Sequence, residues 1–322
     1  MARTERPIPD LLDDARRGSR AALAQLLSLV ERGGQSARTV GKLTYPLGGA
    51  AYTIGLTGAP GAGKSTLVAG LVGALRARAQ QVAVLAVDPT SPFSGGAILG
   101  DRVRMQDHAL DDGVFIRSMA TRGHLGGLAL ATPEAIRVLD AVGFEWVVVE
   151  TVGVGQVEVE VAGAADTTLV VLNPGWGDAV QASKAGLLEI ADVFVINKAD
   201  RPGVDEARRD LEHMLDLAVV PADATQTWRP PIVSTVASDG TGIDGVIDAI
   251  DAHRASMLHN DALDQRRAAR LQDELIAIVS ERVVERVRAV RGGERFVRLQ
   301  AAVAAREVDP WTAADELLDE VE

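Results

Sequence analysis

The sequence of 322 residues contains no cysteine. This absence excludes disulfide bonds, zinc sites built from thiolates and cysteine nucleophiles, and it fits a cytoplasmic protein. The hydrophobic content of 47% is enough to bury a full core, and the length suggests about two domains. We therefore expect a globular protein without thiol chemistry.

Basic residues are also fewer than acidic ones. The chain has 33 Lys and Arg and 45 Asp and Glu, which gives a net charge of −12. Nucleic acids and anionic membranes bind to clustered basic surfaces, so neither is an expected partner. The first residues, "MARTERPIPDLLDDARRG", carry charge throughout and lack the apolar core of a signal peptide. The chain also lacks the run of about 18 apolar residues that a membrane-spanning helix requires. These features predict neither secretion nor membrane insertion.

Short apolar runs alternate with helical stretches from Tyr52 to about Ile250. Continuous apolar strands between helices predict an α/β fold with a mainly parallel sheet that helices cover on both faces. The predicted strands are "YTIGLT", "QVAVLAVD", "VFIRSM", "EWVVVET", "TTLVVLN", "VFVINKAD" and "PPIVSTVA". We assign residues 46–255 to this domain.

The two ends of the chain have helical patterns instead. Two short helices are predicted between Pro9 and Glu31, with Ser19 as an N-cap, and the glycine-rich residues 33–49 are expected to be a connection. These residues form a predicted N-terminal helical arm, residues 1–45.

The strand pattern stops after Asp251, and residues 256–322 are predicted to form a second helical arm. A last helix is expected to start at Pro310 with Asp309 as its cap. An apolar stripe on an earlier helix of this arm needs a surface to cover it, either on its own domain or on a second subunit. The stripe contains Leu271, Leu275, Ile278, Val283, Val287 and Val290.

Residues 58–66, "GAPGAGKST", match the complete phosphate-loop pattern and lie between a predicted strand and a predicted helix. Backbone amides of the loop and the positive end of the following helix suit nucleotide phosphates. We expect Lys64 to reach the β- and γ-phosphates, Ser65 to bind Mg²⁺ and Thr66 to lie near the α-phosphate. The alternative is an ordinary glycine-rich turn. The predicted nucleotide contacts are Gly58, Ala59, Pro60, Gly61, Ala62, Gly63, Lys64, Ser65 and Thr66.

The choice of base is predicted by Asn197-Lys198-Ala199-Asp200, at the end of a later strand. The Asp200 carboxylate is placed to accept hydrogen bonds from N1–H and the 2-amino group of guanine, and adenine offers neither donor. We expect Lys198 to lie over the base and Asn197 to tie this loop to the phosphate loop. The alternative is a helix-capping aspartate. A weaker prediction assigns guanine O6 to the backbone near Val236 and Ala237.

Acidic residues near strand ends are the candidates for metal binding and catalysis. The predicted metal site contains Ser65, Asp88, Asp101 and Glu150, because Mg²⁺ prefers oxygen ligands and retains several waters. Gln156 and Asp101 are the candidates for orienting the attacking water. Each acid has the alternative role of a cap or turn residue.

Three long stretches resemble the MeaB/ArgK family, the bacterial relatives of the human methylmalonic aciduria type A protein. They are the phosphate loop, "AVDPTSPFSGGAILGDRVRM", and the stretch from "ETVGVGQ" to "FVINKAD". The resemblance implies a metallochaperone-like GTPase that uses GTP and Mg²⁺ and binds methylmalonyl-CoA mutase. It also implies that GTP hydrolysis gates the delivery of adenosylcobalamin and protects the mutase from inactivation, with slow turnover until the partner binds.

The resemblance also implies roles for several loops. Asp88 and Asp101 would belong to switch I, residues 150–156 to switch II, and residues 173–184 to a further mobile segment in which Lys184 couples the partner to hydrolysis. Family resemblance favours a homodimer formed through the C-terminal helices. One departure is "STVA", where many GTPases have Ser-Ala, which weakens the O6 prediction.

Three other functions are compatible with a phosphate loop: a metal-insertion GTPase, an ATP-dependent kinase linked to amino-acid transport, and a nucleotide-dependent scaffold that does not hydrolyse. The five histidines are dispersed and form no His-rich tract, which argues against metal insertion. Metal affinity, nucleotide preference and phosphate release distinguish these alternatives.

Overall fold

The computed structural model describes residues 6–89, 108, 110–121, 127–151, 163–175, 189–217, 228–290 and 293–318. The chain divides into two compact units, Met1–Arg270 and Leu271–Glu322. The domain boundaries expected at residues 45 and 255 stay predictions.

The first unit is built on a seven-stranded sheet in the order β3-β2-β4-β1-β5-β6-β7. Every neighbouring pair of strands is parallel, so the predicted α/β fold is confirmed. The central strands are buried along their whole length, which explains why they read as uninterrupted apolar runs. The strands are β1 (Tyr52–Gly58), β2 (Val82–Pro89), β3 (Val114–Thr121), β4 (Trp146–Thr151), β5 (Thr167–Leu172), β6 (Val193–Asn197) and β7 (Ile232–Thr235).

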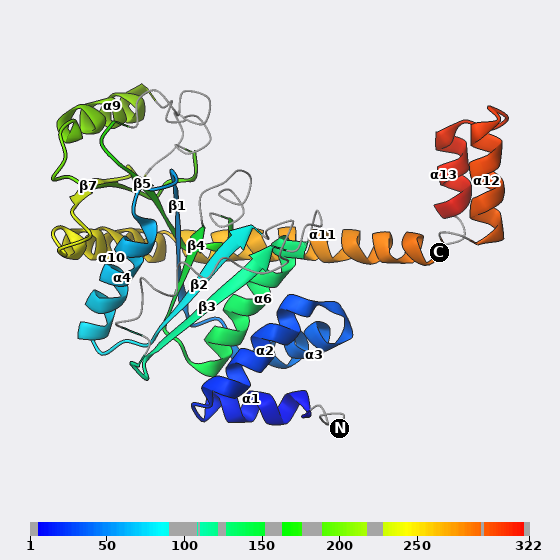
Figure 1. The fold of residues 1–322 in the computed structure, drawn as a ribbon, viewed down its shortest axis with the longest axis horizontal. Coiled ribbons are helices and arrows are strands. Elements are labelled where there is room, and N and C mark those ends of the chain that lie inside the picture. Colours follow the sequence, from blue (N-terminus) through cyan, green and yellow to red (C-terminus); the bar gives the residue numbers. More distant parts are fainter. Residues whose placement is uncertain are drawn as a thin grey trace. The chain divides into compact units, whose positions relative to one another are not determined.

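Helices cover both faces of this sheet (Figure 1). Alternate residues of each strand point to opposite faces, so that Val84 packs with helices α4 (Lys64–Ala77) and α10 (Ile243–His259). Its neighbour Leu85 packs on the other face with the N-terminal helices and α6 (Gly127–Val142). Helix α9 (Val204–Leu217) covers β5 and β6 through Leu211.

The N-terminal arm contains α1 (Ile8–Arg16), α2 (Arg20–Arg32) and α3 (Gly34–Thr44). The predicted cap of α2 is confirmed, because the Ala22 amide donates to Ser19 Oγ at 3.3 Å. The expectation that residues 33–49 form only a connection is wrong. Ala37 and Val40 of α3 are buried, and this tertiary packing outweighs the glycines and polar residues that made the segment read as a loop.

In residues 260–290 and 293–318, the structure describes the helices α11 (Ala262–Val290), α12 (Glu294–Ala304) and α13 (Pro310–Leu318). The last begins as predicted, since Asp309 accepts hydrogen bonds from the amides of Trp311 at 2.9 Å and Thr312 at 3.1 Å. Within the described ranges, no helix has both the length and the apolar character needed to cross a membrane.

The first turns of α11 are attached to the sheet through Asp166, which precedes β5 and is 1% exposed. Arg267 donates to its carboxylate at 2.7 Å, and Arg270 forms a second ion pair with it. Burial alone would raise the pKa of Asp166, but the hydrogen bond from Arg267 and the charge of Arg270 lower it below its usual value.

We predict that Asp166→Asn lowers the free energy of unfolding by about 3 kcal/mol at pH 7, because it leaves two arginines without their counter-charge. A depressed pKa in the folded state stabilises the protein above the unfolded pKa near 4, and this contribution disappears as the pH falls through the folded pKa. The difference between wild type and variant should therefore shrink below about pH 4. Denaturant titrations across this range test it, with Asp216→Asn, from an exposed pair with Arg229, as the control. A pH-independent difference would contradict the prediction.

Candidate active site

The phosphate loop runs from Gly58 at the end of β1 to Lys64 at the start of α4. At two of its glycines, Gly58 and Gly63, a side chain would clash with neighbouring atoms. A Cβ on Gly58 would lie 2.1 Å from Val171 O, and one on Gly63 would lie 2.3 Å from Asn197 Nδ2. Both residues also have positive φ angles, of +131° and +94°. The loop is thus packed tightly against β5 and against the residue that ends β6.

Lys64 is buried in this loop. Its Nζ donates hydrogen bonds to Gly58 O at 2.6 Å and Ala59 O at 3.1 Å. The ammonium group is therefore held over the loop at the positive end of α4, where anionic phosphate oxygens are favoured.

Ser65 and Glu150 form a buried polar pair beside the lysine. Ser65 Oγ donates to Glu150 Oε1 at 2.7 Å, and both side chains are buried. The pair forms because β4 lies next to β1, with Glu150 opposite Leu56. A hydroxyl and a carboxylate oxygen are ligands that Mg²⁺ accepts, so this donor set fits the metal predicted here.

Asn197 connects the phosphate loop with the loop that follows β6. Its Nδ2 donates to Ala62 O of the phosphate loop at 2.8 Å, which is the link between loops that we expected. Its Oδ1 accepts from Thr235 Oγ1 at 3.1 Å and from the Ala237 amide at 3.0 Å. Because Asn197 is 2% exposed, these bonds are shielded from water and hold the ends of β6 and β7 to the phosphate loop.

The residues after Asn197 turn outward. Lys198 has a φ of +60°, and its Nζ donates to Gly61 O at 2.5 Å. Asp200 follows two residues later and is exposed at the surface. This arrangement leaves an acidic side chain in the loop that Lys198 ties to the phosphate loop, as the guanine prediction requires. The Ala237 amide that we assigned to guanine O6 bonds to Asn197 here, so the Val236 and Ala237 assignment stays a prediction.

The structure thus brings together the phosphate loop, Glu150 and the loop of residues 197–200. The backbone of Asp88 lies at the same edge, since its neighbour Val87 pairs with Thr151, but its side chain is outside the described part. Predicted residues that lie outside the described residues altogether are Asp101, Gln156 and Lys184.

Sequence reasoning missed Thr235, which is fully buried and donates to Asn197. The available signal was a hydroxyl residue at the end of an apolar strand, level with Asn197 in the register of β6 and β7.

Comparison with known proteins shows what this chain is similar to. The family model described as methylmalonyl Co-A mutase-associated GTPase MeaB matches residues 23–291. A Pyrococcus abyssi protein with the name "Putative GTPase" is 49% identical over 98% of this chain and 97% of its own length. The mouse protein named methylmalonic aciduria type A homolog, mitochondrial, is 32% identical over 94% of this chain and 76% of its own length.

One solved structure can be aligned with the full length of this chain. The crystal structure of an LAO/AO transport system kinase superposes with a TM-score of 0.73 at 28% identity, covering 100% of this chain and 99% of the other. Together with the family match over residues 23–291, these likenesses show that the chain belongs to the MeaB family of GTPases.

Proposed function

We propose that this chain binds GTP with Mg²⁺ at the site described above, hydrolyses it to GDP and phosphate, and acts as a partner of methylmalonyl-CoA mutase. The observation that carries the proposal is the bond from Asn197 to Ala62, which joins the phosphate loop to residues 197–200, here called the base loop. A nucleotide that contacts both loops can therefore be selected by its base and held by its phosphates.

In the proposed reaction, a water attacks the γ-phosphorus in line as the bond to the GDP oxygen breaks. Lys64 and the loop amides stabilise the charge that develops on the phosphate oxygens. Ser65 and Glu150 would hold Mg²⁺, which supplies positive charge to the phosphates when bound. Asp88 and Asp101 are further proposed ligands, and Gln156 or Asp101 is proposed to orient the water.

The proposed roles of Ser65 and Glu150 predict that their variants differ in Mg²⁺ requirement and in hydrolysis rate. Ser65→Ala should raise the Mg²⁺ concentration needed for half-maximal hydrolysis about tenfold, because a direct ligand is lost. Glu150→Gln keeps the shape but removes the charge, so hydrolysis at saturating GTP should fall by about tenfold or more. Lys64→Ala should instead weaken nucleotide binding. Phosphate release at varied Mg²⁺ measures all three.

The matched control for Glu150→Gln is Glu145→Gln, which changes an exposed acid just before the opposite end of the same strand. It should leave both binding and turnover unchanged. Normal phosphate release in Ser65→Ala, Glu150→Gln and Lys64→Ala together would reject the proposed site.

The mutase partnership is supported by the family description, which names mutase-associated GTPases. We propose that hydrolysis gates adenosylcobalamin delivery to the mutase and protects it, and that mutase binding raises the hydrolysis rate. Sedimentation of the full chain with purified methylmalonyl-CoA mutase tests the partnership. A complex whose stability differs between GTP and GDP is expected, and no complex with either nucleotide would contradict it.

The alternatives remain a metal-insertion GTPase and an ATP-dependent kinase linked to amino-acid transport. The solved relative is named a transport system kinase, and that name concerns the other protein. A kinase should turn over ATP and transfer phosphate to an acceptor. The exposed carboxylate of Asp200 favours GTP over ATP, because guanine offers two donors to it and adenine offers neither.

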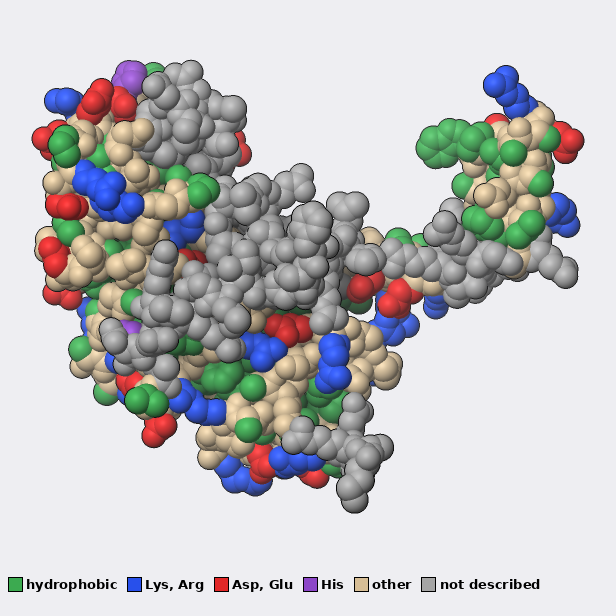
Figure 2. Space-filling view, in the orientation of Figure 1, with side chains coloured by type: hydrophobic (Ala, Val, Ile, Leu, Met, Phe, Trp, Pro, Cys, Tyr) green, Lys and Arg blue, Asp and Glu red, His purple; other side chains and the backbone are tan. Residues whose placement is uncertain are grey.

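A homodimer is the proposed assembly, in a cytoplasmic setting. Beyond Arg270, α11 exposes apolar side chains, of which Leu275 and Val279 are two. Figure 2 shows further apolar side chains over α12 and α13, where Trp311 is 83% exposed. Light scattering should give a dimer mass for the full chain and a monomer mass for the double variant Leu275→Asp, Val279→Asp. Equal masses would exclude these helices as the interface.

A further inference from the structure

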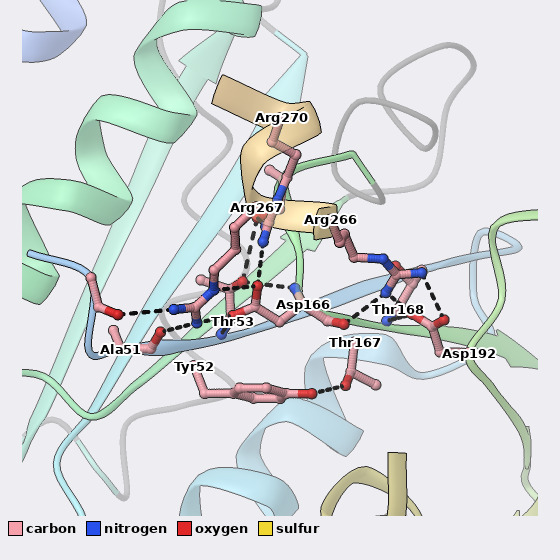
Figure 3. Close-up of polar contacts among 12 residues, drawn as sticks. Ala51, Tyr52, Thr53, Asp166, Thr167, Thr168, Asp192, Arg266, Arg267 and Arg270 are labelled. Atoms are coloured by element: carbon pink, nitrogen blue, oxygen red, sulfur yellow. Dashed lines mark hydrogen bonds and ion pairs between the residues drawn. The ribbon is translucent and has the colours of Figure 1, made fainter. Parts of the chain in front are cut away.

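An ionic cluster of two buried aspartates and partly exposed arginines lies at the amino ends of β5 and β6 and just before β1 (Figure 3). The candidate nucleotide site is at the other ends of these strands. Asp166 immediately precedes β5, and Asp192 immediately precedes β6. Each carboxylate also accepts a backbone amide of the adjacent strand. Thr53 of β1 donates to Asp166 at 3.0 Å, and Thr168 of β5 donates to Asp192 at 2.8 Å. The two acids therefore already link three neighbouring strands.

Arg267 of α11 joins β1 to β5. Its guanidinium donates to Ala51 O at 2.8 Å, just before β1, and to Asp166 Oδ2 at 2.7 Å. It also donates to Gly49 O at 2.9 Å. A planar fork that makes bonds to both strands holds their relative stagger, because a small slide of either strand would misalign these bonds.

Arg266, the preceding residue, joins β5 to β6 in the same way. It donates to Asp166 O at 2.7 Å and to the two carboxylate oxygens of Asp192 at 2.9 and 3.0 Å. Consecutive residues of one helix thus bridge consecutive pairs of strands. Figure 3 shows the two guanidinium groups pointing to opposite sides of Asp166.

The same strands carry the nucleotide loops at their other ends. β1 ends in Gly58 and the phosphate loop, and β6 ends in Asn197 and the base loop. β5 lies between them, with Val171 O against Gly58. The backbone ladders fix the register of these strands, since a slip by one residue would be a shift of about 3.3 Å. Side chains bonded to two strands add to the resistance against smaller changes in stagger.

We propose that Arg266 and Arg267 are positioning residues for the nucleotide site, which set the spacing between the base loop and the phosphate loop from the far end of the sheet. The inference rests on the proposed binding of guanine nucleotides. Arg266 acts on the base loop, because it holds β6 against β5. Arg267 acts on the phosphate loop, because it holds β1 against β5.

The test is calorimetric binding of GDP and of IDP, which lacks the 2-amino group, to the full chain. Arg266→Gln should weaken GDP binding about three- to tenfold and weaken IDP binding less, so that the GDP-to-IDP preference falls. Arg267→Gln should weaken both nucleotides equally. Arg229→Gln, which removes an exposed arginine–aspartate pair of the same length, should change neither. Folded Gln variants with wild-type affinities and preference would overturn the proposal.

Two further measurements serve if a Gln variant does not fold. Arg266→Lys keeps the positive charge but loses the planar pair of donors. Its GDP-to-IDP preference should also fall, but by less than in Arg266→Gln. In the wild type, GDP should slow hydrogen exchange in residues 262–270, because coupling between two sites is reciprocal. Unchanged exchange, or an unchanged preference in Arg266→Lys, would overturn the inference. A wild type that fails to bind GDP would overturn the proposed function, and the inference with it.

Discussion

Replacing Asp200 with Asn should weaken GTP binding on the order of 100-fold and improve the binding of xanthosine triphosphate. In the proposed complex the carboxylate would accept from two guanine donors, and each hydrogen bond to a charged group contributes about 1.5–3 kcal/mol. The amide presents a donor to guanine where an acceptor is needed, and xanthine carries an oxygen at that position. The exposed position of Asp200, two residues after the lysine that bonds Gly61, makes this exchange possible without disturbing the core.

The measurement is a titration of both nucleotides against wild type and variant. The control is Asp205→Asn, which changes an acid in the first turn of α9, five residues further along. It should keep the wild-type preference. A D200N variant that still prefers GTP would show that base recognition lies elsewhere.

Gly58→Ala should be the most damaging small substitution in the phosphate loop. Its Cβ would overlap the backbone of β5, where Val171 O lies 2.1 Å away, and a backbone atom cannot rotate aside. Its φ of +131° lies outside the left-handed helical region that L-residues sometimes adopt, and it adds a cost of about 1–3 kcal/mol. We expect a loss of about 3 kcal/mol or more in the free energy of unfolding, measured without nucleotide.

Gly61→Ala is the matched control, because Gly61 also has a positive φ, of +73°, in the same loop. A Cβ there meets nothing within 4 Å, so this variant should show only the backbone cost. Chemical denaturation of the two variants separates steric overlap from backbone strain. Equal losses would mean that contact with β5 does not limit this position.

Much of the fold follows from local pattern. Strands that are buried on both faces do not need a polar face toward water. The strands β1, β4, β5 and β6 are therefore recognisable in the sequence as continuous apolar runs. Helix α3 was missed for the opposite reason. Its polar and glycine-rich sequence becomes helical because Val40 is buried against its neighbours, and that contact is not visible locally.

The candidate site also has parts that the sequence predicts and parts that it does not. The phosphate loop and residues 197–200 carry their chemistry in short motifs, and parallel topology brings strand ends to one edge. Contacts between distant residues could not be predicted. Thr235 lies in a predicted strand, and nothing in the local sequence marks its bond to Asn197. Asp166 lies just before a predicted strand, and its partner Arg267 is about 100 positions later in the chain.

Guanine-specific hydrolysis is tested most directly by steady-state phosphate release from the full chain, supplied with Mg²⁺ and either GTP or ATP, with and without methylmalonyl-CoA mutase. We expect release from GTP, little from ATP, a faster rate with the mutase, and loss of release in Lys64→Ala. Equal release from ATP, or release that Lys64→Ala does not reduce, would contradict a guanine-specific site at this phosphate loop.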